Sequence, residues 1–129
     1  MGEPLIEYRK IGLLATCIGN ERIRIDADGS LHHARNRREC EPGGLWSSDW
    51  RQVGKLDAGD LEALLRAIRA TGLLALPAAM VDEAAEGGRR EELLVMIGAV
   101  AHRFVVQNSD QPAFRKAVQL IWGTLAGAV

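Results

Sequence analysis

The chain is poor in the features that mark several common classes of protein. Its 129 residues carry a formal net charge of −1, so long-range attraction favours neither a nucleic acid nor an anionic membrane as a partner. No apolar run approaches the roughly 18 residues needed to cross a bilayer, and the N-terminus lacks the apolar core of a secretion signal. We therefore expect a soluble cytoplasmic protein with no nucleic-acid or membrane partner.

Cysteine is scarce as well. Cys17 and Cys40 lie far apart and neither belongs to a C-x-x-C pair, so two free, reduced thiols are expected in a reducing compartment. Cys17 sits in an apolar stretch and is interpreted as a small core residue. Cys40 has cations and anions beside it, so opposing effects on its pKa offset one another. We expect Cys40 alone to react with a thiol reagent in the native protein.

The motifs of common catalytic and cofactor sites are absent. The sequence contains no G-x-x-x-x-G-K-[ST], G-x-G-x-x-G, G-x-S-x-G or H-E-x-x-H, which removes the starting residues of many enzyme sites. Asp26-Ala27-Asp28-Gly29 is similar to the centre of a calcium loop. With Gly29 at the sixth position, however, the first and last ligands would be Arg24 and Arg35, which cannot bind a cation. We predict no catalytic residue, cofactor or metal.

What the sequence does contain is one clearly specified helix between Leu56 and Pro77. Asp57 can cap its first turn, and Gly72 suits the left-handed position that ends many helices. Apolar residues recur in it at the i, i+3, i+4, i+7 spacing of a buried stripe. The residues of this stripe are Leu61, Leu64, Leu65 and Ile68.

Short strand-like runs flank this helix on both sides. Asp28-Gly29 and Gly98-Ala99 each separate two such runs and predict two hairpins. A second apolar stripe follows Pro112 and predicts a closing helix. The strand-like runs are Leu5–Ile18, which holds one or two strands with a bend or bulge expected at Gly12, Arg22–Ile25, a run starting at Leu31, Trp50–Leu56, Leu93–Ile97 and Ala101–Val106.

The order of these elements predicts the fold class. Strands come in groups rather than alternating with helices, which favours an antiparallel sheet. We predict one α+β domain over residues 1–129, with about five antiparallel strands, two helices on one face and the order β-β-β-α-β-β-α. The polar segment 39–49 and the segment Pro77–Glu92 are predicted loops.

The histidines offer an alternative, chemical interpretation. His32 and His33 are adjacent in a predicted strand, so their side chains point to opposite faces and do not readily share a metal. A solvated pair at a sheet edge is the simpler interpretation. With Cys40 and nearby acids they would supply a sparse ligand set for a small enzyme or a metal-dependent domain. His102 is isolated in its strand.

Arginine and tryptophan supply the candidate binding residues. Arg35, Arg37 and Arg38 form the one local basic cluster in the sequence, which is either a solvated strand end or a site for a carboxylate or phosphate. Trp46 and Trp50 lie in a Gly/Ser-rich loop, where a large aromatic side chain folds back on the sheet or docks into a partner. We expect Trp50 to fold back, and take Arg35, Arg37, Arg38 and Trp46 as candidate partner-binding residues.

The chain also resembles a known family, on motifs spread along its length. These are Asp28-Gly29 in a hairpin, Gly54-x-Leu56 before the capped helix, Leu61-x-x-Leu64-Leu65, Leu74-Ala75-Leu76-Pro77 and His102-x-Phe104 in a strand pair. From about Leu5 to Leu125 this pattern is similar to the emfourin-type protealysin inhibitors, small bacterial proteins that block thermolysin-like metalloproteases. The resemblance implies an α+β fold and a non-catalytic, protein-binding role, and it assigns no inhibitory residue. The chain departs from the pattern between Asn36 and Trp50.

The leading interpretation is a small non-catalytic protein-interaction domain that inhibits or regulates a partner protein, such as a bacterial metalloprotease. Its contacts are expected in the loops Asn36–Trp50 and Pro77–Glu92. One alternative is an enzyme or metal-dependent domain using His32, His33 and Cys40. Another is an oligomeric structural subunit that pairs through a sheet edge. A monomer or a homodimer is compatible with the sequence.

Overall fold

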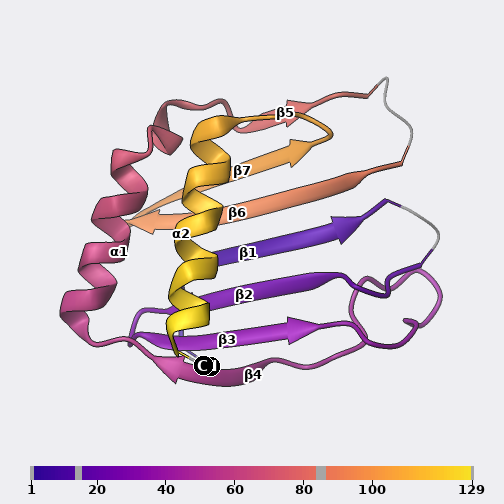
Figure 1. Cartoon of the computed structure of the whole chain (residues 1–129), viewed down its shortest axis with the longest axis horizontal. Coiled ribbons are helices and arrows are strands. Elements are labelled where there is room, and N and C mark those ends of the chain that lie inside the picture. The colour runs from indigo at the N-terminus through magenta and orange to yellow at the C-terminus, as the bar shows by residue number, and fades with distance from the viewer. Residues whose placement is uncertain (1, 14–15, 84–86, 129) are drawn as a thin grey trace.

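The strands form one mixed sheet of seven strands, with two helices packed on it (Figure 1). The computed structural model describes residues 2–13, 16–83 and 87–128. Across the sheet the strands lie in the order β4-β3-β2-β1-β6-β7-β5, and all neighbours are antiparallel except β5, which runs parallel to β7. In chain order the elements are β1 (Pro4–Gly12), β2 (Glu21–Asp26), β3 (Ser30–Arg35), β4 (Arg51–Lys55), α1 (Ala58–Ala70), η1 (Leu73–Ala75), β5 (Ala79–Val81), β6 (Arg89–Ile97), β7 (Val100–Gln107) and α2 (Pro112–Ala128).

The predicted sheet of about five antiparallel strands is wrong, although the α+β class is right. Four strands precede α1 and three lie between the helices, so the order of elements differs from the prediction. The parallel strand β5 lies inside the predicted loop Pro77–Glu92. It has only three residues, too few for a period-two pattern, and its partner β7 is distant in sequence. Met80, opposite Val106 in this ladder, is buried.

The predicted boundaries are also wrong at the ends of β1 and β6. β1 covers the first part of the predicted strand region Leu5–Ile18 and ends at Gly12. β6 begins at Arg89, so its first four residues, Arg89–Glu92, are all charged and do not show the hydrophobic pattern of a strand. Positions 14–15 of the predicted strand region Leu5–Ile18 and positions 84–86 of the predicted loop Pro77–Glu92 lie outside the described residues.

The helix α1 has the predicted cap and largely the predicted inward face. The Asp57 side chain accepts a hydrogen bond from the N–H of Asp60 at 2.8 Å, which satisfies one of the unpaired donors of the first turn. Gly72 has a φ of 87°, the left-handed conformation predicted for it. Leu65 differs from the prediction because it is only half-buried, at the margin of the core. The fully buried stripe is Leu61, Leu64 and Ile68.

The helix α2 crosses the middle of the sheet, and α1 packs beside it (Figure 1). Gly54 of β4 allows the end of α2 to come close, since a Cβ at Gly54 would lie 2.9 Å from the Cβ of Ala128. The buried residues of α2 are Phe114, Ala117, Val118, Ile121 and Leu125. They share one core with the sheet residues Ile6, Tyr8, Ile23, Ile25, Leu31, Leu93, Val95, Phe104 and Val106.

The two helices leave much of the sheet uncovered. Beyond α2, the end of β1 and the starts of β2 and β6 extend without a helix over them (Figure 1). The opposite face of the sheet has no helix among the described residues, and charged side chains on it pair within their own strand. Arg9 pairs with Glu7 at 2.8 Å, and Arg90 pairs with Glu92 at 2.9 Å. A large part of the sheet surface is therefore open to polar side chains.

Ile68 and Leu65 of α1 differ in burial, and this difference provides a test of the packing. Ile68 has no exposed surface, so Ile68→Ala should lower the free energy of unfolding by about 2–5 kcal/mol through lost burial and a cavity. Leu65→Ala should cost clearly less because Leu65 already contacts solvent. Urea titration of the two variants measures both values. Equal losses would contradict the placement of Leu65 at the margin of the core.

Candidate functional site

The two adjacent histidines lie on opposite faces of β3 and bind different carboxylates. Nε2 of His33 is 2.6 Å from Oε2 of Glu21, and Nε2 of His32 is 3.2 Å from Oδ2 of Asp26. The predicted solvated edge pair is wrong because β3 lies between β2 and β4, and His32 is buried. The structure does not bring His32, His33 and Cys40 together. Within the described ranges, no group of three or more His, Cys, Asp or Glu residues is arranged to hold a metal ion.

The two cysteines form a disulfide rather than remaining free thiols. Cys17 and Cys40 are joined across 23 positions of sequence, with their Cα atoms 6.1 Å apart. The bond ties the connection between β1 and β2 to the loop between β3 and β4. The prediction of free thiols, with Cys40 reactive in the native state, is therefore wrong, and the cytoplasmic prediction loses the support of that argument. Only the tertiary approach of the two loops could have revealed the pairing.

A buried asparagine organises the loop between β3 and β4. The Asn36 side chain is 1% exposed, and its Nδ2 donates hydrogen bonds to the carbonyls of Cys17 at 2.9 Å and Leu45 at 2.7 Å. Its Oδ1 accepts from the N–H of Ser47 at 2.9 Å. Asn20, also buried, donates to the same Leu45 carbonyl at 3.2 Å. These bonds pair loop backbone groups that would otherwise lose water without gaining a partner.

An arginine between the sheet and the loop fixes both loop tryptophans. The guanidinium carbon of Arg22 lies 4.6 Å from the ring centre of Trp46 and 4.4 Å from that of Trp50. Its NH2 group donates to the Ser48 carbonyl at 3.0 Å. Burial, and then the nearby charge of Arg9, lower the pKa of Arg22. Trp50 folds back on the sheet as expected, and Trp46, for which both outcomes were open, does the same.

A glutamate joins the same loop to the connection between β1 and β2 by hydrogen bonds. The Thr16 hydroxyl donates to Oε2 of Glu39 at 2.7 Å, and the Cys17 N–H donates to Oε1 at 3.2 Å. The hydrogen bond from Thr16 is the main cause that holds the pKa of Glu39 below its usual value, followed by the bond from Cys17. The charged form of Glu39 therefore stabilises the junction of the two loops.

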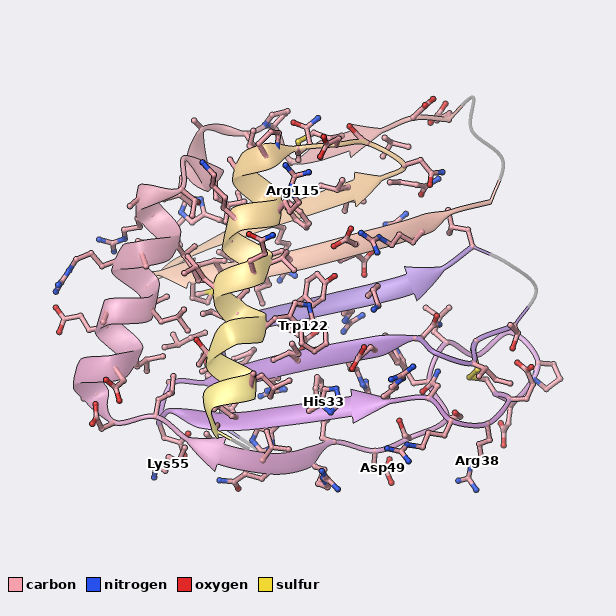
Figure 2. All side chains as sticks on the ribbon, in the orientation of Figure 1. His33, Arg38, Asp49, Lys55, Arg115 and Trp122 are labelled. Atoms are coloured by element: carbon pink, nitrogen blue, oxygen red, sulfur yellow. A yellow bond between two sulfur atoms is a disulfide. The ribbon has the colours of Figure 1, made fainter. Side chains whose placement is uncertain are left out.

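The loop built in this way presents arginines around a groove. Arg35, Arg37 and Arg38 line it together with Arg51 of β4, and its volume of about 620 Å³ lies in the range of ligand sites. Figure 2 shows Arg38 and Asp49 at this end of the molecule, with His33 nearer to α2. We call this surface the arginine groove. Its other lining residues are His33, Ala34, Ser47, Ser48 and Asp49.

The arginines of this groove are unpaired. Six arginine side chains in the described chain have neither an ion pair nor a hydrogen bond, and four of the six, Arg35, Arg37, Arg38 and Arg51, line the groove. All four are exposed. Sequence reasoning missed Arg51 because its approach depends on the register that places it opposite His33. Trp46 does not line the groove and contacts Arg22 instead.

A second cavity, of about 660 Å³, lies beside α2, and its charges are compensated within the chain. The Tyr8 hydroxyl donates to Glu91 at 2.7 Å, and burial raises the pKa of Tyr8. Lys10 lies 3.5 Å from Glu21 and 5.8 Å from the ring centre of Trp122, which Figure 2 shows above the sheet near His33. Arg89 and Arg115, which also line this cavity, are each paired with a carboxylate. It therefore offers no uncompensated charge to a ligand.

Comparison with known proteins adds no family to these observations. Neither a protein-family model nor a curated protein sequence matches the chain. The resemblance to the emfourin-type inhibitors stays a prediction based on the residues that carry it. Neither helix in the described ranges is both long and apolar enough to cross a membrane.

The disulfide should contribute measurably to stability. Replacing both cysteines, Cys17→Ser with Cys40→Ser, should lower the free energy of unfolding by about 3 kcal/mol because the unfolded chain regains the entropy of an open loop. Denaturant titration of the oxidised protein and the double variant measures the difference. A thiol count of two in the unfolded, unreduced protein would contradict the bond itself.

The lowered pKa of Glu39 predicts the direction of one pH effect. A carboxylate with a depressed folded-state pKa stabilises the fold above its ordinary pKa of 4.5, and that contribution is lost as pH falls through the folded-state pKa. Wild type should therefore lose more stability than Glu39→Gln between about pH 7 and about pH 3. Urea titrations at both pH values give the comparison, and an equal loss in both proteins would show that Glu39 contributes nothing.

Proposed function

We propose that this protein is a small, non-catalytic interaction module that binds another protein through the arginine groove. The observation that carries the proposal is the contrast between the loop's scaffold and its surface. Asn36, the Cys17–Cys40 disulfide and Arg22 hold the loop from inside. The groove arginines contribute no ion pair to that scaffold, and their mutual repulsion opposes folding.

A loop held in place before binding favours tight association. Ordering a flexible loop at an interface costs free energy, and a loop already fixed by its own contacts avoids most of that cost. Arginine is enriched at protein interfaces because its planar guanidinium makes several hydrogen bonds in a defined geometry. The groove combines both properties, which supports a binding role over a solvated strand end.

The chemical alternative has less support from the geometry. A metal or thiol site using His32, His33 and Cys40 would need three side chains that lie on two faces of the sheet and in a disulfide. The resemblance to the emfourin-type inhibitors supports a protein as the partner. Inhibition of a thermolysin-like metalloprotease is the specific form of the proposal that this resemblance suggests.

Cross-linking combined with charge-matched variants tests the proposal. The chain is cross-linked to partners in a lysate of its source organism, and the cross-linked positions are mapped by mass spectrometry. Arg37→Ala with Arg38→Ala should weaken recovery of the partner about tenfold, while the fold is retained because Arg38 contributes only its backbone carbonyl to the loop. Thermal unfolding of the variants checks that the fold is retained.

The matched control is Arg69→Ala with Arg103→Ala, two exposed arginines that form no ion pair with any residue the structure describes and lie far from the groove in sequence. It makes the same change in net charge and should leave recovery unchanged. Equal losses in both double variants, or cross-links that avoid positions 35–51, would contradict the proposal. Hydrolysis of a peptide by a thermolysin-like protease, with and without the chain, tests the inhibitor form separately.

A further inference from the structure

We infer that the partner segment held in the arginine groove is an acidic, extended stretch of polypeptide, rich in Asp and Glu, that lies along the free edge of β4. The inference rests on the proposed function and specifies the chemistry of the partner. It follows from three features of the groove: its uncompensated charge, its position at an edge of the sheet, and the charges along that edge.

The charge of the groove selects an anionic partner. Four arginines line it against one carboxylate, Asp49, so the arginines exceed the carboxylates by three positive charges. The Glu21 carboxylate beside His33 is already bound by His33 and Lys10. Carboxylates can accept two hydrogen bonds from one guanidinium, which makes the arginine–carboxylate pair both strong and directional.

The position of the groove selects an extended partner. β4 is an outermost strand, paired with β3 on one side and with no strand of the described residues on the other. Arg51, which lines the groove, is the first residue of that strand. An edge strand offers backbone N–H and C=O groups that a further strand can pair with. A segment entering the groove can therefore continue along β4 in an extended conformation.

The charges on β4 disfavour a second copy of the same chain at this edge. The strand reads Arg51-Gln52-Val53-Gly54-Lys55 and contains cations but no acid. Pairing of β4 with β4 of another copy brings only like charges near one another, in either direction and in any register, and this is unfavourable across strands. With an acidic strand at this edge, the electrostatic interaction across the strands becomes attractive.

The phosphate groups of a nucleic acid are also anions that arginines bind, but two observations disfavour a nucleic acid as the partner. The tryptophans of the loop contact Arg22 and His32, so they are not free to stack on bases. The chain as a whole has a net charge of −1, which gives no long-range attraction to a phosphate backbone.

Peptide binding tests the inference directly. A labelled peptide of about eight residues, alternating Glu or Asp with Val or Thr, spans one strand, and its control replaces every acid by the matching amide. Fluorescence anisotropy with the oxidised protein should show the acidic peptide binding at least about tenfold more tightly than the amide peptide, with the difference reduced at high salt. Arg37→Ala with Arg38→Ala should remove most of this preference, whereas Arg69→Ala with Arg103→Ala should retain it.

Two further probes separate the acidic strand from its alternatives. An acidic peptide methylated at alternate backbone nitrogens should bind several-fold more weakly in at least one of its two registers, because strand pairing uses every second N–H. A single-stranded oligonucleotide of similar length should bind more weakly than the acidic peptide. Equal binding of the acidic and amide peptides, tighter binding of the oligonucleotide, or no effect of methylation in either register would overturn the inference.

Failure of this inference differs from failure of the proposed function. If the amide peptide binds as well as the acidic one while Arg37→Ala with Arg38→Ala still releases a cross-linked partner, the interaction module stands and the acidic strand is wrong. If neither peptide binding nor partner recovery responds to that double variant, both are wrong.

Discussion

A seven-stranded sheet with two helices cannot bury both of its faces, and this constraint shapes the rest of the molecule. The helix α2 covers the middle of one face, so the apolar core lies beneath it and beside α1. Elsewhere the strands carry charged side chains that tolerate water, and opposite charges beside them reduce the repulsion between like charges. On the open face this is achieved by pairs within a strand, such as Arg9 with Glu7. On the helix-bearing face it is achieved by Glu21, which binds both Lys10 and His33.

Against this background of paired charges, the arginine groove stands out. Arg35 is the last residue of β3, the strand whose two histidines are both bound to carboxylates, yet it has no such partner in the described chain. Surface ion pairs contribute little to stability, so an unpaired arginine is unremarkable on its own. Four unpaired arginines in one groove are less easily explained in this way. Their mutual repulsion opposes the packing of the loop, which other residues hold in place.

The parts of this structure that could be predicted from sequence are those encoded by neighbouring residues. The helix α1 has its cap and stripe within a few residues of each other, so Asp57 and Ile68 were placed correctly. The strand β5 and the disulfide could not be predicted, because each depends on a partner brought near by the whole fold. The residues of the arginine groove likewise fall into a part that the sequence could predict and a part that it could not. Arg35, Arg37 and Arg38 are adjacent in sequence, whereas Arg51 joins them only through the β3–β4 register.

The buried asparagine explains how such a surface can be held together. A loop of this length, rich in Gly and Ser, has many backbone groups that need partners. Asn36 supplies partners from inside, with a side chain that both donates and accepts and that needs no charge. The bonds of Arg22 and Glu39 complete the scaffold from either side. Because none of these contacts uses the side chain of a groove arginine, the outward arginines can respond to a partner without any change in the scaffold that positions them.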